Sequence, residues 1–125
     1  MSTIKVGTLL AADGSTTTQP SIPALDKRMA KAWCVYQGNT NTLSSDYNVS
    51  SVTDVATGTF TVNYAVSVTN AIHTTLASSA TSSGAARNIV AGAQSASTSS
   101  ANLNAESSDG AALDISGISF IAFDN

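Results

Sequence analysis

The segment T-F-T-V-N-Y-A-V-S-V-T, Thr59–Thr69, alternates apolar and polar side chains along its whole length. The large apolar residues share one parity: Phe60, Val62, Tyr64, Val66 and Val68. Successive side chains of a β-strand point to opposite faces, so the pattern predicts one strand with an apolar and a polar face. This segment therefore predicts a β fold, and we expect Phe60 in the core.

Strand signals continue upstream. The run A-W-C-V-Y-Q-G, Ala32–Gly38, is apolar on both faces, which predicts a strand buried on both sides or one using a face for oligomer contact. We expect Trp33 in the core. Tyr47–Val52 is the next predicted strand, and the turn Asp54–Gly58 predicts a hairpin of Val49–Thr53 with Thr59–Val66.

The second half is rich in Ala, Ser and Thr, which disfavour helix when Gly and Asn are also frequent. Four further strands are predicted there: Ala71–Leu76, Asn88–Ala93, Ser99–Leu103 and Ile115–Phe123. The last one is apolar on both faces, so it should be central in its sheet or covered by another subunit. The chain is therefore predicted to be all-β.

The N-terminal part differs in character. Ile4–Leu9 predicts a short strand, Asp13-Gly14 a turn, and Ser15–Pro23, with both prolines, an extended connector. Asp26–Lys31 predicts a helical turn or a lead into the next strand. Its basic residues form either a solvated face or a docking contact for an acidic neighbour: Lys27, Arg28 and Lys31.

Composition excludes several classes of function. Charged residues make up 10% of the 125 residues and the net charge is −3, which argues against a general nucleic-acid binder. No apolar run is long enough to cross a bilayer, so we expect no membrane insertion. The N-terminus lacks the pattern of a signal peptide, which predicts synthesis in a cytoplasm and use there or release by lysis. Cys34, the only cysteine, is predicted to be buried and unreactive.

The sequence offers no catalytic constellation. His73 is the only histidine and is interpreted as an ordinary exposed or hydrogen-bonded strand residue. Carboxylates occur singly, with no spacing typical of metal ligands, and no nucleophile or phosphate-loop motif is present. We therefore predict a protein that is not an enzyme and needs no cofactor or metal.

Two features could support ligand binding. The polar face of Thr59–Thr69 is a row of hydroxyls and an amide that could bind carbohydrate, with stacking aromatics drawn from Trp33, Tyr36, Tyr47 and Tyr64. The alternative is that these aromatics belong to the core, and this stays open for Tyr36 and Tyr47. Arg87 follows a Ser- and Gly-containing loop and is either a contact residue or an ordinary surface arginine.

Three segments together resemble a domain of tailed-phage tail fibres and related virion proteins: Lys31–Gly38 (K-A-W-C-V-Y-Q-G), Tyr47–Asp54 (Y-N-V-S-S-V-T-D) and Gly58–Tyr64 (G-T-F-T-V-N-Y). The terminal Ile118–Phe123 is similar to the closing strand of that family. Cys34 departs from the family's usual W-V order, and no binding residues are carried over.

The resemblance implies a small antiparallel β-sandwich, jelly-roll-like and usually trimeric, exposed on a virion and without catalytic activity. Residues 1–31 would be an N-terminal strand and connector arm that attaches to other tail or capsid proteins, and residues 32–125 the sandwich knob. A host surface glycan or protein is a further expected partner.

Three hypotheses follow. The leading one is a non-enzymatic, homotrimeric knob of the tail-fibre type on a bacteriophage virion, assembled in the host cytoplasm and involved in host attachment. The second is a capsid decoration, or cement, protein with the same fold. The third is a carbohydrate-binding module or carbohydrate-active enzyme of a spike.

Overall fold

A computed structural model describes residues 6–8, 10–14, 28–79, 90–107 and 109–124. These residues contain eight strands and no helix. The strands are, in chain order, β1 (Ala30–Gln37), β2 (Thr42–Tyr47), β3 (Val49–Ala56), β4 (Thr59–Tyr64), β5 (Thr74–Ser79), β6 (Val90–Ser97), β7 (Ser100–Glu106) and β8 (Ile118–Phe123).

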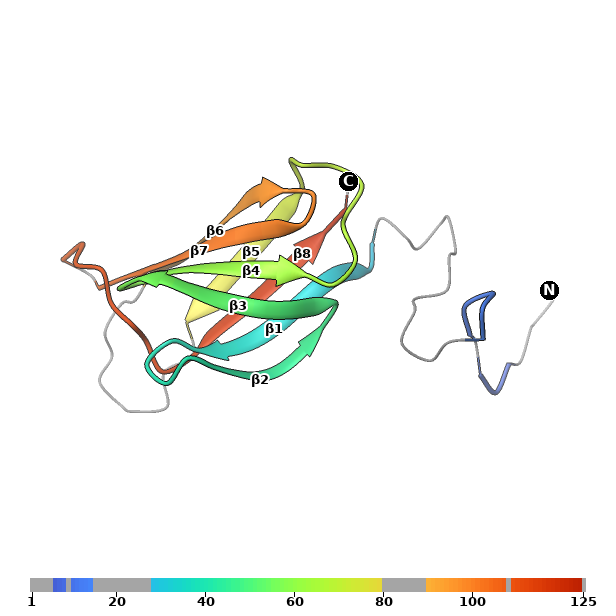
Figure 1. Ribbon diagram of the computed structural model, residues 1–125, viewed down its shortest axis with the longest axis horizontal. Helices are drawn as coiled ribbons and strands as arrows, with labels where there is room; N and C mark the ends of the chain where they lie inside the picture. Colours follow the sequence, from blue (N-terminus) through green and yellow to red (C-terminus); the bar gives the residue numbers. More distant parts are fainter. Residues whose placement is uncertain (1–5, 9, 15–27, 80–89, 108, 125) are drawn as a thin grey trace, which may run out of the picture.

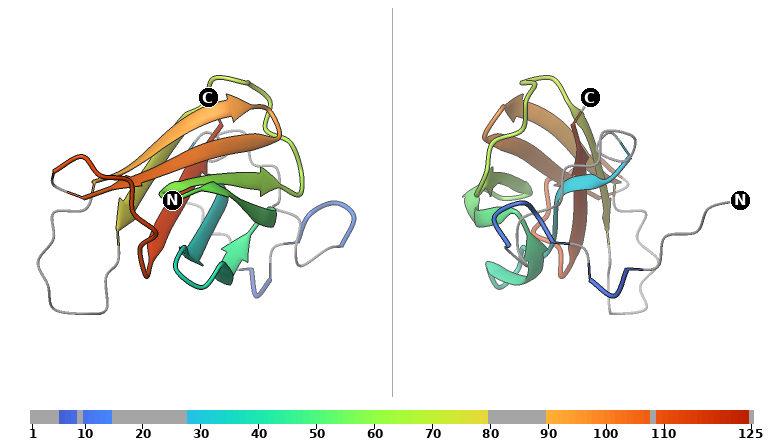
Figure 2. Two further views of the ribbon diagram at one scale, coloured as in Figure 1. Left: turned by 60° about the vertical axis from the view of Figure 1, so that its left-hand side comes forward. Right: turned by 90° about the vertical axis from the view of Figure 1, so that its right-hand side faces the viewer.

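The strands form two four-stranded sheets that pack face to face (Figure 1). One sheet has the order β2-β1-β8-β5 and the other β3-β4-β7-β6, with every neighbouring pair antiparallel. The two layers are seen from other sides in Figure 2. The expected all-β, small antiparallel sandwich is confirmed.

The core lies between the two sheets, where alternate residues of each strand point inward. On β4 these are Phe60, Val62 and Tyr64, as the alternation predicts. Other large buried side chains are Leu103 on the neighbouring strand β7 and, from the facing sheet, Cys34 and Tyr36 on β1 and Ile118 and Phe120 on β8. The Tyr36 ring meets Phe60 edge-on at 5.2 Å between centroids, which joins the two sheets.

The predicted hairpin is confirmed as β3–β4, joined at Thr57-Gly58. Gly58 has a φ of +70°, and a Cβ at this position would lie 2.4 Å from the carbonyl oxygen of Ala105. Its amide donates to Asp114 Oδ1 at 2.7 Å, and its carbonyl accepts from the amide of Ala105 at 2.8 Å. Glycine is required here both by the backbone conformation and by the close approach of β7.

The expectation that one strand runs through Thr69 is wrong, because β4 ends at Tyr64. Beyond Tyr64, the backbone of Val66 bonds to the side chain of Asn48 and not to a neighbouring strand. Asn48 Oδ1 accepts from the amide of Val66 at 2.7 Å, and Nδ2 donates to the carbonyl of Val66 at 2.9 Å. Val66 is consequently exposed, and Val68 reaches the core from a loop.

The single strand expected at Tyr47–Val52 is also wrong. Asn48 has a φ of 54° and separates β2 from β3, which belong to different sheets. Asparagine is one of the few residues that adopts this left-handed conformation at low cost. The turn at Asn48, called the Asn48 corner below, therefore takes the chain from one sheet to the other.

The four strands expected in the second half are all present as β5 to β8, with three of them ending later than predicted. β5 continues past Leu76 to Ser79, and β6 continues past Ala93 to Ser97. Strand β8 is central in its sheet, between β1 and β5, which confirms the expectation drawn from its two apolar faces.

Near the N-terminus, the turn expected at Asp13-Gly14 is confirmed, since the Gly14 amide donates to the carbonyl of Ala11 at 2.9 Å and Gly14 has a φ of 74°. The connector Ser15–Pro23 lies outside the described residues, as does half of Ile4–Leu9, and the described half, residues 6–8, forms no strand. β1 begins at Ala30, two residues before the predicted start of the sandwich at residue 32. The last two residues of Asp26–Lys31 are therefore the first two of a strand.

We expect Asn48→Ala to lower the free energy of unfolding by about 2–4 kcal/mol, because alanine strains a left-handed backbone and removes three side-chain hydrogen bonds. Asn48→Gly, the matched control, keeps the backbone relaxed and should cost about 1 kcal/mol less. Urea unfolding of the unmodified chain, Asn48→Ala and Asn48→Gly measures the cost of the backbone strain and the cost of the lost hydrogen bonds separately. An Asn48→Ala protein as stable as the unmodified chain would contradict the assigned role of this corner.

Candidate functional site

A row of apolar side chains crosses the outer face of the sheet β2-β1-β8-β5. Directly paired residues of antiparallel strands lie on the same face. Trp33 on β1 pairs with Tyr47 on β2 and with Ile121 on β8, and Ile121 pairs with Leu76 on β5. These four residues, Tyr47, Trp33, Ile121 and Leu76, are called the apolar stripe below.

The apolar stripe points away from the core. Trp33 is 38% exposed and Leu76 is 58% exposed, whereas Tyr47 and Ile121 are half-buried. The prediction that Trp33 lies in the core is therefore wrong. Its neighbours Cys34 and Tyr36 have the inward parity of β1, which leaves Trp33 on the outside. Half-buried Val35 and Phe123 have the same outward parity as the stripe, on β1 and β8.

The outer face of the other sheet, β3-β4-β7-β6, has the opposite chemistry. Apart from exposed Val55 near the end of β3, the outward residues of β3, β4 and β7 carry hydroxyls and amides: Ser51, Thr53, Thr61, Asn63, Ser100, Asn102 and Asn104. Many of them bond to one another across the strands. Asn63 Nδ2 donates to Ser51 Oγ and Thr53 Oγ1, each at 3.1 Å, and Thr61 Oγ1 donates to Asn102 Oδ1 at 3.2 Å. This surface, the polar face, is thus largely satisfied by its own hydrogen bonds.

The combination of a hydroxyl row with stacking aromatics does not form. The hydroxyl row of β4 lies on the polar face, while Trp33 and Tyr47 lie on the far side of the molecule in the other sheet. Tyr36 and Tyr64 are buried, so their rings offer no stacking surface. Carbohydrate binding by these residues together is therefore not supported by their positions.

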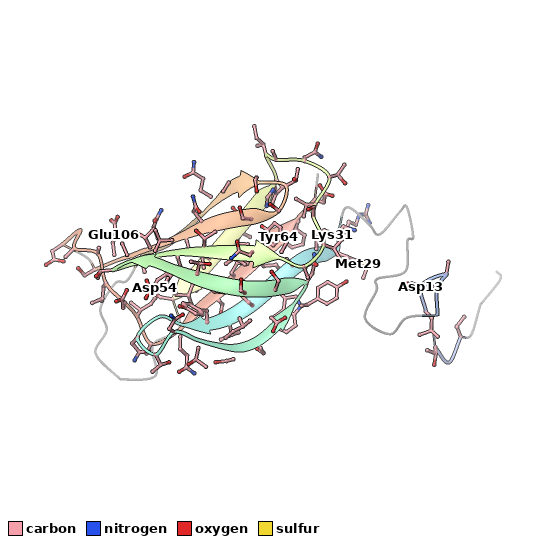
Figure 3. All side chains as sticks on the ribbon, in the orientation of Figure 1. Asp13, Met29, Lys31, Asp54, Tyr64 and Glu106 are labelled. Atoms are coloured by element: carbon pink, nitrogen blue, oxygen red, sulfur yellow. The ribbon has the colours of Figure 1, made fainter. Side chains whose placement is uncertain are left out.

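The residues predicted as contacts are distributed as follows. Tyr36, for which the core and a contact surface were both open, lies in the core, and its hydroxyl donates to Asn41 Oδ1 at 2.5 Å. Tyr47 belongs to the apolar stripe. Arg28 is exposed and Lys31 half-buried, close to the start of β1, where Figure 3 labels Lys31. Lys27 and Arg87 lie outside the described residues.

Lys31 is near the carboxyl group of Asp124, which follows β8. Asp124 Oδ2 accepts from the amide of Thr69 at 2.8 Å. Burial pushes the pKa of Asp124 upward, but hydrogen bonds from Thr69 and Asn70 and the charge of Lys31 together hold this pKa below its ordinary value. Lys31 therefore helps to fix the chain end that follows β8.

His73 is buried in the loop before β5, not exposed on a strand. Its Nδ1 lies 3.1 Å from the carbonyl oxygen of Asn70, and its Nε2 lies 2.8 Å from the hydroxyl of Tyr64. A carbonyl only accepts, so Nδ1 carries a proton, and in the neutral form of the ring Nε2 accepts from the hydroxyl of Tyr64. Both ring nitrogens are thus occupied, which confirms a hydrogen-bonded, structural histidine. Figure 3 labels Tyr64, which lies at the end of β4.

Cys34 is buried in the core, as predicted. Burial, with a smaller contribution from the charge of Asp46, raises the pKa of its thiol from 9.0 to about 12. Burial likewise raises the pKa of the Tyr64 hydroxyl. Neither group is prepared to act as a nucleophile or base near neutral pH.

Other chemistry is not indicated by the part of the chain that the structure describes. Among those residues, no three His, Cys, Asp or Glu side chains gather as a metal site would require. None of the described segments is a helix long and apolar enough to cross a membrane. Comparisons with family models, curated proteins and solved structures found no match to the chain. The apolar stripe, which leaves Trp33 and Leu76 exposed across a four-stranded sheet, is the candidate functional site.

Sequence reasoning missed the stripe as a unit, although it noted its parts. The two apolar faces of Ala32–Gly38 and Ile115–Phe123 indicated a second contact surface besides the core. Leu76 carried no such signal. Only the strand pairing of β1, β8 and β5 brings Leu76 beside Ile121, and that register depends on the whole sheet.

We expect Cys34 to resist alkylation in the folded protein at pH 8. A pKa of about 12 in place of 9.0 lowers the reactive thiolate roughly a thousandfold. Iodoacetamide labelling followed by mass spectrometry measures the rate. The same chain in guanidinium chloride, and a Gly7→Cys variant in buffer, are controls that should react at ordinary rates. Equal rates for folded and unfolded Cys34 would contradict the assigned burial.

Proposed function

We propose that this chain is a non-enzymatic structural protein of a tailed-phage virion, a homotrimeric knob of the tail-fibre type that self-associates through the apolar stripe. The observation that carries the proposal is the contrast between the two outer faces. The polar face satisfies its own hydrogen bonds, whereas the stripe leaves Trp33 and Leu76 exposed across a four-stranded sheet.

Exposed apolar surface of this kind is typical of an interface. Monomeric proteins rarely expose contiguous apolar patches that span several strands, and exposed aromatic residues are enriched where partners bind. The stripe supports self-association, and the resemblance of Lys31–Gly38, Tyr47–Asp54 and Gly58–Tyr64 to virion domains supports its setting. The trimeric state comes from that resemblance.

Oligomeric state tests the self-association. We expect sedimentation velocity at micromolar concentration to give a trimer for the unmodified chain, and Leu76→Ser to weaken the association at least about tenfold, since an apolar side chain of this size contributes over 1.4 kcal/mol when buried. The matched control is Val55→Ser on β3, because Val55 is 60% exposed and lies outside the stripe. A monomeric unmodified chain would contradict the proposal.

Electron microscopy of intact phage particles tests the proposed location of the chain on the virion. Density confined to the tail is the expected result for a fibre knob, with residues 1–31 toward the tail proteins or a neighbouring copy. Density over the whole shell would assign the chain to capsid decoration instead. Hydrolysis of a host polysaccharide by the purified chain would overturn its non-enzymatic character.

A further inference from the structure

Charge is divided unevenly between the two parts of the chain. Residues 1–29, which precede β1, hold three of the five basic residues and two of the eight acidic ones, which gives this arm a net charge of +1. Residues 30–125 hold two basic and six acidic residues, a net charge of −4. The arm and the sandwich are therefore electrostatically complementary, which favours their encounter.

The arm also contains apolar residues, two of which, Val6 and Leu10, are exposed in the part of the chain that the structure describes. Ile4, Val6 and Leu10 share one parity in the sequence, as the core-facing residues of a strand do. Of these, the structure describes Val6 and Leu10, which are 60% and 42% exposed. The arm and the apolar stripe are thus two apolar surfaces that both remain open in a single chain.

The length of the chain allows the arm to reach another molecule. Ala11–Met29 comprises nineteen residues between the apolar part of the arm and β1. Extended chain spans at most about 3.3–3.6 Å per residue, so this connector can cover on the order of 60 Å. It joins the sandwich at β1, the strand that carries Trp33.

We infer that the occupant of the apolar stripe is the arm of a second copy, with Val6 and Leu10 of one chain lying on Trp33, Ile121 and Leu76 of the next. This inference rests on the proposed self-association and names the segment that achieves it. One contact covers both open surfaces and brings the basic arm to an acidic sandwich. A chain bound in this way both offers an arm and receives one.

Trp33 provides a direct readout, because it is the only tryptophan and lies in the stripe. The test uses a full-length Gly7→Cys/Trp33→Phe chain with a nitroxide quencher on the new cysteine. An added Cβ at Gly7 has no neighbour within 4 Å, and buried Cys34 stays unlabelled. This chain is mixed in about tenfold excess with the unmodified protein. Emission from Trp33 should then fall by roughly half or more, because mass action loads most stripes with labelled arms.

Matched variants of the labelled chain test which residues bind. Val6→Ser/Leu10→Ser should raise the concentration needed for quenching at least about tenfold, since two apolar anchors are lost. Thr8→Ser/Ala12→Ser changes the same segment without removing a large apolar residue and should quench as before. Equal quenching by both double variants would overturn the assigned contact.

The remaining outcomes separate this inference from the proposed function. Label and Trp33 share one chain in a labelled Gly7→Cys protein that keeps Trp33. Quenching found only in that protein, and unchanged by dilution, would show that the arm covers its own sandwich and would overturn the inferred contact between copies. A trimer whose Trp33 is never quenched would also overturn it, while leaving self-association through the stripe intact. A chain that is monomeric and unquenched at every concentration would overturn both.

Discussion

The hydrogen bonds of Asn48 hold the two sheets in their places. A left-handed backbone at this residue turns the chain from β2 in one sheet to β3 in the other. Its side-chain amide donates to the carbonyl of Lys31 at 2.8 Å and bonds to both the amide and the carbonyl of Val66. One side chain thereby joins the start of β1, the corner between sheets and the exit from β4. Only asparagine combines an amide donor, an amide acceptor and ready access to this backbone conformation.

The opposite end of the β3–β4 hairpin is fastened by Gly58, whose amide and carbonyl bond to Asp114 and Ala105. Its lack of a Cβ lets β7 and the segment before β8 approach closely. With both ends of the hairpin fixed, the residues between them keep one register, and Phe60, Val62 and Tyr64 face the core. A fixed core also fixes the two outer faces, because each strand residue that does not point inward must point out. The stripe is a consequence of that parity.

The sequence predicted what depends on local alternation and missed what depends on distant contacts. The inward face of β4 and the central place of β8 follow from the spacing of their apolar residues. The end of β4 at Tyr64 could not be predicted, because it is set by a side chain sixteen or more residues earlier, at Asn48. Trp33 was misplaced because β1 is apolar on both faces, and periodicity alone does not say which face is the core. The stripe depends on the register of four strands, of which only β1 and β2 are consecutive in the chain.

The edge strands of the two sheets are protected against pairing with a strand of another copy. Association of copies is therefore expected through the outer faces of the sheets. Charges and irregular pairing protect an edge from strand addition. β3 carries Asp54 and two register irregularities, and β2 carries Asp46 beside the irregularity between Val35 and Tyr36. β5 lies beside β6 of the opposite sheet. A contact from arm to stripe is heterologous, and such contacts end in a closed ring when the rotation between copies allows it. A ring of three copies would bury three arms and three stripes together, and it would leave the polar face toward water.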